Sequence, residues 1–367
     1  MKTVMHIHFW ADIRNSAGSV EKVITAFASH GKTYRHQIAC CVSGHSVDRK
    51  GFDLTSFEHH GVMTYPFIED RWRNKLCNKL LGLGAFTYSS LIRIVNENRP
   101  DILHFHNLQE QIDAVVSRLS YRPGIVAHYH RHFMQPVQPH SPCTLVFLSQ
   151  ASLDYFWGAM HIDKPYRLLG NPLSLEIMAL GPFSPKTQPV PSAPVTLLYG
   201  GGGNPIKGLE ELLAAFARLP HGRAQLILAG AKLEKWRPID IPGVEIVGPL
   251  SAADYFKWVE QADVTLMPSH YEPFGLIAQE AMYLKRLLLV STSGALAEFT
   301  DDNCAITVAP QNVDSLHQGI LRAIDMIGTA EADALITRAF ERIQDFHPRN
   351  VVQRLERIYD DTLDGTV

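Results

Sequence analysis

The chain has 367 residues, of which 46% are hydrophobic, enough for two cores. Its formal net charge of −3 creates no general basic field, so nucleic acid is not expected as a partner. No apolar run approaches the roughly 20 residues that cross a bilayer, and histidines interrupt the N-terminal segment where a signal peptide would be apolar. The five cysteines form no C-x-x-C pair. These features predict a cytoplasmic enzyme with reduced thiols.

Short apolar runs alternate with longer helical stretches, a pattern typical of parallel sheets built from βαβ units. The first half is predicted to contain strands at residues 3–9, 37–43, 62–66, 102–106, 124–130 and 144–149. Prolines then crowd the segment up to Pro194, which favours a linker over a strand. A second series of strands is predicted at residues 195–199, 224–229, 244–247, 264–267, 287–291 and 305–309.

This order predicts an α/β protein with two Rossmann-like, doubly wound parallel-sheet domains. Residues 1–172 are expected to form the first domain, 173–194 the linker and 195–345 the second domain. Residues 346–367 include apolar side chains at helical spacing, which predicts a final helix that crosses back to cover the first domain. Ligands of open α/β sheets bind beyond the carboxyl ends of the strands, so the loops there are the places to search.

Two regions of the first domain offer candidates. Gly18 opens a helix, and its close backbone approach serves a phosphate or a sugar, or forms an ordinary strand-to-helix turn. His104 and His106 share one strand face, as do His128 and His130, yet the sequence shows no carboxylate or cysteine that completes a ligand set, so no metal is expected. His130 at the strand tip is the candidate to contact a sugar, whereas His128 is expected in the core.

The second domain begins with a glycine-rich loop, Tyr-Gly-Gly-Gly-Gly-Asn-Pro-Ile-Lys-Gly at residues 199–208. Glycines such as Gly201 and Gly202 allow the backbone to approach a diphosphate, and Lys207 supplies a positive charge. A dinucleotide site would need G-x-G-x-x-G followed by an acidic residue about 20 positions later, and the spacing here does not provide it.

The most informative segment starts at Glu272, just after a predicted strand, with Pro273 expected in the first helical turn. Helix-start amides and the helix dipole near Gly275 and Leu276 suit a pyrophosphate. Glu272 is placed to meet sugar hydroxyls, and Glu280, roughly two turns into the helix, to accept from a ribose diol. The alternative is a chance spacing in which Glu280 is a solvated surface charge.

Together these residues resemble the retaining glycosyltransferases of the GT-B fold, in particular family 4 (glycosyl transferases group 1) of bacterial envelope polysaccharide type. The similarity spans most of the chain. Its strongest part is the segment from Glu272 to Met282, which follows the E-x-F-G-x-x-x-x-E signature. The other matching motifs are Ile206-Lys-Gly208, Asp101-Ile-Leu-His-Phe-His106, Tyr129-His130 and Gly18-Ser-Val-Glu21.

The resemblance implies catalytic roles for His130, Lys207 and Glu272. Lys207 would neutralise the diphosphate leaving group, Glu272 would hold the donor sugar, and His130 would contact that sugar near its reactive carbon. Glu280 would bind the ribose. The full implied donor-binding set is Gly18, Gly201, Gly202, Lys207, Glu272, Phe274, Gly275, Leu276 and Glu280.

One departure from the family pattern is Gly201, where the family usually has an arginine. Loss of an arginine–phosphate contact weakens leaving-group stabilisation, and Arg131 and Arg286 are candidates to replace it. No D-x-D pair ends a strand, so transfer is expected to need no metal and no cofactor. In family chemistry the departing phosphate accepts the proton of the acceptor hydroxyl.

The acceptor is expected to be a saccharide or a lipid-linked saccharide. A basic amphipathic segment with Arg71, Trp72, Arg73, Lys75 and Lys79 predicts peripheral contact with the anionic inner face of the cytoplasmic membrane, and an ordinary solvated helix is the alternative. Two other functions stay open: a nucleotide-sugar epimerase or isomerase of the same fold, and a catalytically weakened nucleotide-sugar-binding protein.

Overall fold

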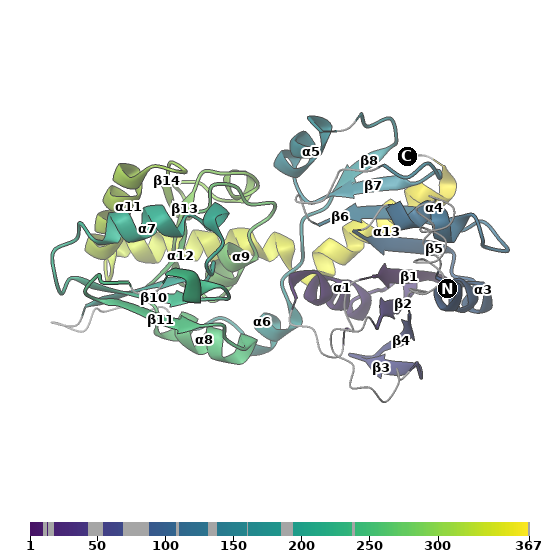
Figure 1. The fold of residues 1–367 in the computed structure, drawn as a ribbon, viewed down its shortest axis with the longest axis horizontal. Helices are drawn as coiled ribbons and strands as arrows, with labels where there is room; N and C mark the ends of the chain where they lie inside the picture. The colour runs from purple at the N-terminus through teal and green to yellow at the C-terminus, as the bar shows by residue number, and fades with distance from the viewer. Residues whose placement is uncertain are drawn as a thin grey trace. The chain divides into compact units, whose positions relative to one another are not determined.

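The structure is a computed structural model that describes residues 1–9, 13, 18–42, 54–68, 88–107, 110–130, 138–159, 161–184, 194–236 and 239–365. The chain divides into two compact units (Figure 1). Unit 1 comprises Met1–Pro172 and Pro348–Val367, and unit 2 comprises Leu173–His347. Each unit is built on a mainly parallel sheet, which confirms the predicted α/β fold class.

The sheet of unit 1 has the strand order β3-β4-β2-β1-β5-β6-β7-β8, and only the β3–β4 pair is antiparallel. Its strands are β1 (Lys2–His8), β2 (Tyr34–Cys41), β3 (Phe57–His59), β4 (Val62–Phe67), β5 (Ile102–His106), β6 (Gly124–Tyr129), β7 (Thr144–Phe147) and β8 (Tyr166–Leu168). The sequence prediction missed β3 and β8, because each has three residues, too few to show a hydrophobic period. It also began β2 three residues late, since Tyr34 to His36 look polar or isolated in the sequence.

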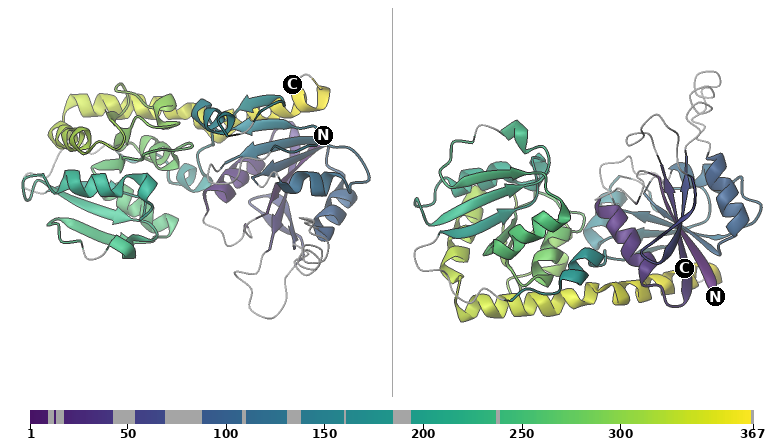
Figure 2. Two further views of the ribbon diagram at one scale, coloured as in Figure 1. Left: turned by 45° about the horizontal axis from the view of Figure 1, so that its top comes forward. Right: turned by 90° about the horizontal axis from the view of Figure 1, so that it is seen from below.

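The described helices of unit 1 are α1 (Ser19–Ser29), α3 (Ser89–Asn98), α4 (Glu110–Val116), α5 (Gln150–Trp157) and α13 (Pro348–Asp364). Strand alternation gives the sheet two different faces. One carries apolar side chains such as Met5 and Phe105, which pack against α3, α4 and α5 in the main core. The other carries buried histidines and is covered by α1 and α13, which contact each other (Figure 2).

Helix α13 is held to unit 1 by polar contacts as well as by its apolar face. Glu356 lies inside the unit, and its Oε1 accepts from the backbone N–H groups of Lys32, Thr33 and Tyr34 at 2.8, 3.0 and 3.2 Å. The Tyr34 hydroxyl donates to Asp360 at 2.7 Å. These contacts tie the C-terminal helix to the start of β2.

The sheet of unit 2 has the strand order β11-β10-β9-β12-β13-β14 and is parallel throughout. Its strands are β9 (Val195–Tyr199), β10 (Ala224–Ala229), β11 (Val244–Gly248), β12 (Val264–Met267), β13 (Leu287–Ser291) and β14 (Ile306–Val308). These lie within about one residue of the predicted strands, because each is a short apolar run between turn residues. None of the helices in the described ranges is long and apolar enough to span a membrane.

The helical elements of unit 2 surround that sheet. They are α6 (Leu175–Leu180), η1 (Pro205–Lys207), α7 (Leu209–Phe216), η2 (Leu233–Trp236), α8 (Ala252–Gln261), α9 (Leu276–Tyr283), α10 (Leu296–Phe299), α11 (Val313–Met326), α12 (Ala330–Ile343) and η3 (Gln344–Phe346). One core layer packs α7 and α11 against the sheet, and the other packs α8 and α9 against its opposite face; α12 contributes buried residues to both.

Glu356 predicts a specific pH dependence of stability. Burial raises the pKa of this carboxyl, but its contacts with His36 and the backbone amides of Lys32 and Thr33 outweigh burial and lower the pKa to about 2. Because the folded pKa lies below the unfolded one, the contribution of about 2–3 kcal/mol is complete above pH 4.5 and is lost as the pH falls toward 2.

Glu356→Gln should therefore lower the free energy of unfolding of unit 1 at pH 7 and should flatten its pH dependence below pH 4.5. Hydrogen exchange at the β2 amides of the full chain measures both effects. Glu97→Gln, at an exposed position on α3, is the matched control. Equal acid sensitivity in wild-type protein and Glu356→Gln would contradict the prediction.

Candidate functional site

The candidate residues of unit 2 gather at the carboxyl edge of its sheet. Strands β10, β9, β12 and β13 are neighbours, so the loops that follow them meet at one edge. The N–H of His270, after β12, donates to the carbonyl of Ile206, after β9, at 2.8 Å. Gly208 has a φ of +73°, and a Cβ there would lie 2.0 Å from the carbonyl oxygen of Pro268. These two contacts hold the glycine-rich loop against the loop that begins α9.

Lys207 and Glu272 form the ionic centre of this edge. The ammonium of Lys207 donates to a carboxylate oxygen of Glu272, and the hydroxyl of Ser269 lies 3.4 Å from the same oxygen. Glu272 is buried, whereas the Lys207 side chain remains 26% exposed. The backbone of Glu272 is also held in place, because its carbonyl accepts a hydrogen bond from the N–H of Ala295 at 2.9 Å. The structure thus brings together the two unit 2 residues with predicted catalytic roles.

The glycine-rich loop packs backbone against backbone on the loop after β10. The N–H of Gly202 donates to Ala229 at 3.1 Å and that of Gly203 to Ala231 at 2.8 Å. A Cβ on Gly203 would lie 2.2 Å from the carbonyl oxygen of Lys232. The sequence assigned these glycines to close contact with a diphosphate, but these two amides already serve internal hydrogen bonds.

Gly201 is small because Tyr199 fills the space beside it. A Cβ at Gly201 would lie 2.5 Å from the Tyr199 hydroxyl and 2.6 Å from the ring carbon that bears it. That hydroxyl donates to the carbonyl of Gly202 at 3.0 Å, and the ring is fully buried. Burial, with the nearby charge of Glu272, raises the pKa of Tyr199 and keeps it a neutral donor. Any side chain at position 201 must therefore displace a fixed aromatic ring.

Helix α9 begins at Leu276, later than the sequence predicted. Pro273 precedes the helix, and Gly275 is its N-cap with a φ of +97°, which favours glycine. The first amides, starting at Leu276, have no intrahelical acceptor by helix geometry, so they are oriented toward the edge. Glu280 is half-buried about one turn into the helix, one turn earlier than the sequence predicted, and burial together with the charge of Glu280 raises the pKa of Tyr255.

Tyr255 is a residue that sequence reasoning missed. Its hydroxyl is buried and has no hydrogen-bond partner within the described ranges. A Cβ on Gly200 would lie 2.9 Å from it and 3.2 Å from the end of Ile277, so the hydroxyl sits where the glycine-rich loop meets α9. No sequence motif marks Tyr255, because it lies on α8, outside both the glycine-rich loop and the segment that begins α9.

Phe274 belongs to the predicted donor-binding set, and its side chain lies in the core. The ring packs against Phe299 and Phe346 with centroid separations of 5.5 Å each, and it is 5% exposed. A ligand at the α9 start can therefore meet the backbone at this position but not the ring.

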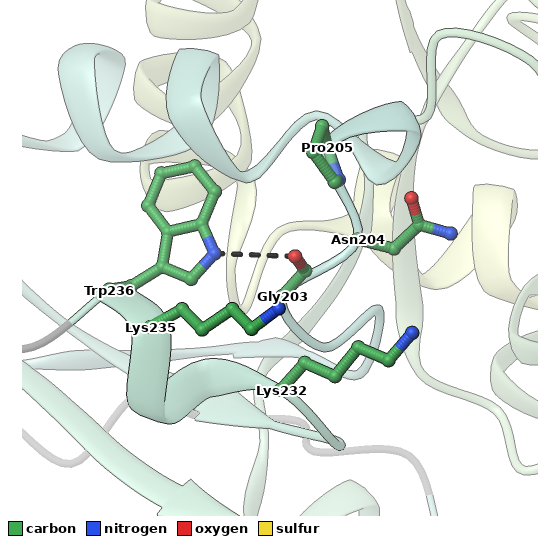
Figure 3. Close-up of a pocket in the computed structure, with 6 residues that line it drawn as sticks. All are labelled: Gly203, Asn204, Pro205, Lys232, Lys235 and Trp236. Atoms are coloured by element: carbon green, nitrogen blue, oxygen red, sulfur yellow. Dashed lines mark hydrogen bonds between the residues drawn. The ribbon is translucent and has the colours of Figure 1, made fainter.

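A pocket of about 500 Å³ opens beside the glycine-rich loop (Figure 3). Its lining residues are Gly203, Asn204, Pro205, Lys232, Lys235 and Trp236. Lys232 and Lys235 reach toward the glycine-rich loop, and the indole N–H of Trp236 donates to the carbonyl of Gly203 at 3.3 Å. The sequence could have indicated Lys232, Lys235 and Trp236, because they follow the carboxyl end of the strand predicted at residues 224–229.

Arg286, one of the two candidates to replace the family arginine, makes other contacts. The Arg286 guanidinium is buried and donates to the carbonyls of Val259, Glu260, Ser184 and Lys285 at 3.0–3.1 Å. The guanidinium therefore connects α8 with the turn between α9 and β13.

Several other predicted residues lie outside the described ranges. They are Arg131 and the basic segment with Arg71, Trp72, Arg73, Lys75 and Lys79.

In unit 1, Gly18 is the N-cap of α1 and makes room for an acidic side chain. A Cβ there would lie 2.1 Å from a carboxylate oxygen of Glu21, and the φ of Gly18 is an ordinary −69°. The other oxygen of Glu21 contacts Nε2 of His8 at 2.9 Å, with both residues buried. A larger residue at position 18 would therefore have to displace the Glu21 carboxylate, and the buried His8–Glu21 pair lies at the carboxyl end of β1.

His130 follows β6 directly, and its Nε2 lies 2.9 Å from Nδ1 of His106. Its backbone N–H donates to the side chain of Asn107 at 2.9 Å. His128 is fully buried, and its Nδ1 lies 3.3 Å from Nε2 of His104. His130 therefore stands at the strand tip and His128 deeper in the sheet.

Two groups of three buried histidines bring ring nitrogens within 4.8 Å of one another. They are His6, His104 and His106, and His106, His128 and His130. Imidazole nitrogens are ligands for zinc and related metals, so among the described residues of unit 1 these two groups offer such a donor set. Within each group one pair of ring nitrogens is already in contact, at 3.0 Å between His6 and His106 and at 2.9 Å between His106 and His130. The sequence prediction weighed the pairs on β5 and β6 and missed His6, although His6 and His8 repeat the same alternation on β1.

The space at Gly201 generates a prediction. Gly201→Arg, which restores the family residue, should lower the melting temperature and should not improve nucleotide binding, because Tyr199 must move. Gly201→Ala should also destabilise, by about 1–3 kcal/mol. Gly158→Ala is the control, since a Cβ there meets nothing closer than 3.6 Å. A Gly201→Arg protein as stable as wild type would contradict this prediction, because it would show that the Tyr199 ring moves at little cost in free energy.

Comparison with known proteins assigns this edge of unit 2 to a family domain. Residues 193–326 match the family model described as Glycosyl transferases group 1. A curated relative, glycogen synthase of Mycobacterium tuberculosis, is 29% identical over 179 residues. That alignment covers 46% of this chain and 43% of the relative, so the chain spans less than half the length of the relative it matches.

Solved structures match the whole fold. Sucrose-phosphate synthase from Thermosynechococcus elongatus superposes with a TM-score of 0.72 at 17% identity and covers 100% of both chains. Anabaena HepE in complex with UDP and glucose superposes with a TM-score of 0.68 at 15% identity, covering 97% of this chain and 99% of that one. The protein thus has the fold of the GT-B glycosyltransferases, and its second unit carries a glycosyl transferases group 1 domain.

Proposed function

We propose that the protein is a retaining glycosyltransferase that moves a hexose-type sugar from a nucleotide-sugar donor to a saccharide or lipid-linked saccharide. The observation that carries this proposal is the ion pair between Lys207 and Glu272 beside the start of α9. An ammonium, a buried carboxylate and helix-start amides are together what a sugar diphosphate requires. The group 1 match, which spans this edge, supports the same chemistry.

In this proposal the ion pair is the resting state of the donor site. The diphosphate of the donor draws Lys207 toward its negative charge, and this frees Glu272 to accept from sugar hydroxyls. Lys232 and Lys235 supply further positive charge where the family arginine is absent. Glu280 and the buried hydroxyl of Tyr255 bind the ribose end of the nucleotide.

The transfer is proposed to need no metal, because lysines and amides neutralise the leaving group. The departing phosphate takes the proton of the acceptor hydroxyl, as the family resemblance implies. A role in bacterial cell-surface polysaccharide or lipopolysaccharide synthesis remains a prediction from that resemblance, as does contact with the inner face of the cytoplasmic membrane.

The proposal is tested by incubating the full chain with UDP-, GDP- and ADP-sugars, each with glycan and lipid-linked acceptors, in the presence of EDTA. Mass spectrometry identifies the product, and NMR compares the anomeric configuration of donor and product. Retained configuration in EDTA supports the proposal, and inversion contradicts it. Conversion of the donor sugar without an acceptor points to an epimerase or isomerase, and binding without any turnover points to a nucleotide-sugar-binding protein.

Charge removal at the ion pair gives a sharper prediction. Lys207→Met should weaken UDP binding by about tenfold to a hundredfold, because a charged contact with phosphate is worth about 1.5–3 kcal/mol. Isothermal titration calorimetry measures the effect. Lys257→Met is the matched control, since Lys257 is an exposed lysine of the same unit. Equal UDP affinity in the two variants would remove Lys207 from the diphosphate site.

A further inference from the structure

The buried face of the unit 1 sheet carries an unbroken line of four imidazole rings. Nδ1 of His36 lies 2.8 Å from Nε2 of His6, and Nδ1 of His6 lies 3.0 Å from Nε2 of His106. Nδ1 of His106 in turn lies 2.9 Å from Nε2 of His130. Every link has hydrogen-bond length, and every link joins an Nδ1 to the Nε2 of the neighbouring ring.

The parallel register produces this line. The strands β2, β1, β5 and β6 are consecutive neighbours in the sheet. His36 is paired with Val4, His6 with His104, and His106 with His128. Each hydrogen bond therefore crosses one strand and advances two residues toward the carboxyl edge, which keeps the rings on one face.

The far end of the line faces a carboxylate. Nε2 of His36 lies 3.7 Å from Oε1 of Glu356, a buried carboxylate that can only accept hydrogen bonds. The favoured position for the His36 proton is therefore Nε2. The His36 side chain is 1% exposed, and Oε1 of Glu356 also accepts from three backbone amides.

Burial, followed by the neighbouring imidazoles, lowers the pKa values of His6 and His106 well below the ordinary range. Each of these rings is then neutral at pH 7 and carries one proton, so one nitrogen donates and the other accepts. If His36 accepts at Nδ1, His6 must donate from Nε2 and accept at Nδ1. The same step repeats at His106 and ends at His130.

We propose that this histidine relay, from Glu356 through His36, His6 and His106, fixes His130 in the tautomer that is protonated at Nε2 and bare at Nδ1. Nδ1 of His130, which follows the carboxyl end of β6, then has the protonation state of a hydrogen-bond acceptor, the state that contact with a hydroxyl group of the substrate would require. His36, His6 and Glu356 are positioning residues in this scheme, because they act through His106 and His130. The match to a sugar hydroxyl rests on the proposed function, whereas the tautomer does not.

A second line of contacts supplies a control within the same fold. The Tyr359 hydroxyl lies 2.7 Å from Nδ1 of His104, whose Nε2 lies 3.3 Å from Nδ1 of His128. His128 is as buried as the relay rings and lies only two residues from His130 on β6. His36, by contrast, lies three strands away from His130. If proximity decides the His130 tautomer, His128 should affect it more than His36 does. If the hydrogen-bonded line decides it, His36 should affect it more.

The test uses the full chain labelled with ¹⁵N in its histidine rings and long-range ¹H–¹⁵N NMR, which distinguishes protonated from bare ring nitrogens. His130→Gln assigns the His130 signals. The wild-type spectrum should show His130 protonated at Nε2 alone. Protonation at Nδ1, or stoichiometric zinc in the purified protein whose removal by a chelator shifts these signals, would overturn the proposal.

Two variants of His36 then test the coupling. His36→Leu removes the acceptor, so the His130 tautomer should become mixed, and the KM for the nucleotide sugar should rise about threefold to tenfold at similar kcat. His36→Asn keeps an acceptor at the Nδ1 position and should restore both values. His128→Gln should leave the His130 tautomer as in wild type. A tautomer that responds to His128 and ignores His36 would refute the relay.

These measurements separate the two proposals. If no nucleotide sugar is turned over but the tautomer follows His36 as expected, the relay stands and the proposed function fails. If the protein transfers sugar while the His130 tautomer is Nδ1-protonated, the function stands and the relay fails. Should His36→Leu not fold, the wild-type spectrum and His36→Asn still decide the tautomer.

Discussion

Parallel strand pairing decides where the polar groups of both units lie. In unit 2 it brings the loops after β9, β10, β12 and β13 to one edge, where Lys207 meets Glu272. In unit 1 it sets neighbouring strands in a register that turns alternate histidines into a diagonal line. Because a shift of one residue would send each side chain to the opposite face, both arrangements depend on register more than on any single contact.

The two units bury polarity in different ways. Unit 2 keeps an ion pair at the edge of its sheet, where Lys207 retains access to solvent and the pair can open. Unit 1 places uncharged rings inside a closed layer, with Phe27 stacked against several of them and Glu356 behind the line. Neutral imidazoles cost less free energy to bury than charged groups when their nitrogens have hydrogen-bond partners. In this line each ring supplies a partner to the next ring.

The sequence predicted the fold class and the strands of unit 2 well, because buried parallel strands are short apolar runs between turns. It predicted that Lys207, Glu272 and Gly275 belong together, since motif spacing places them after neighbouring strands. It could not predict that Tyr199 fills the space beside Gly201 or that Arg286 is held by carbonyls, because both facts depend on tertiary packing. It noticed histidine pairs on β5 and β6, but the line needs the strand order, which places β1 and β2 beside them.

The discontinuity of unit 1 bears on how the chain becomes structured during synthesis. Unit 2 is one continuous stretch, complete once His347 has been made, whereas unit 1 lacks Glu356 and Tyr359 until the last helix leaves the ribosome. Domains generally form as soon as their residues are available. The first part of unit 1 must therefore wait without the α13 side chains that contact the amides at the start of β2 and cover the histidine rings, until residues 348–367 have been made. A chain interrupted after His347 would leave unit 2 complete and unit 1 unfinished.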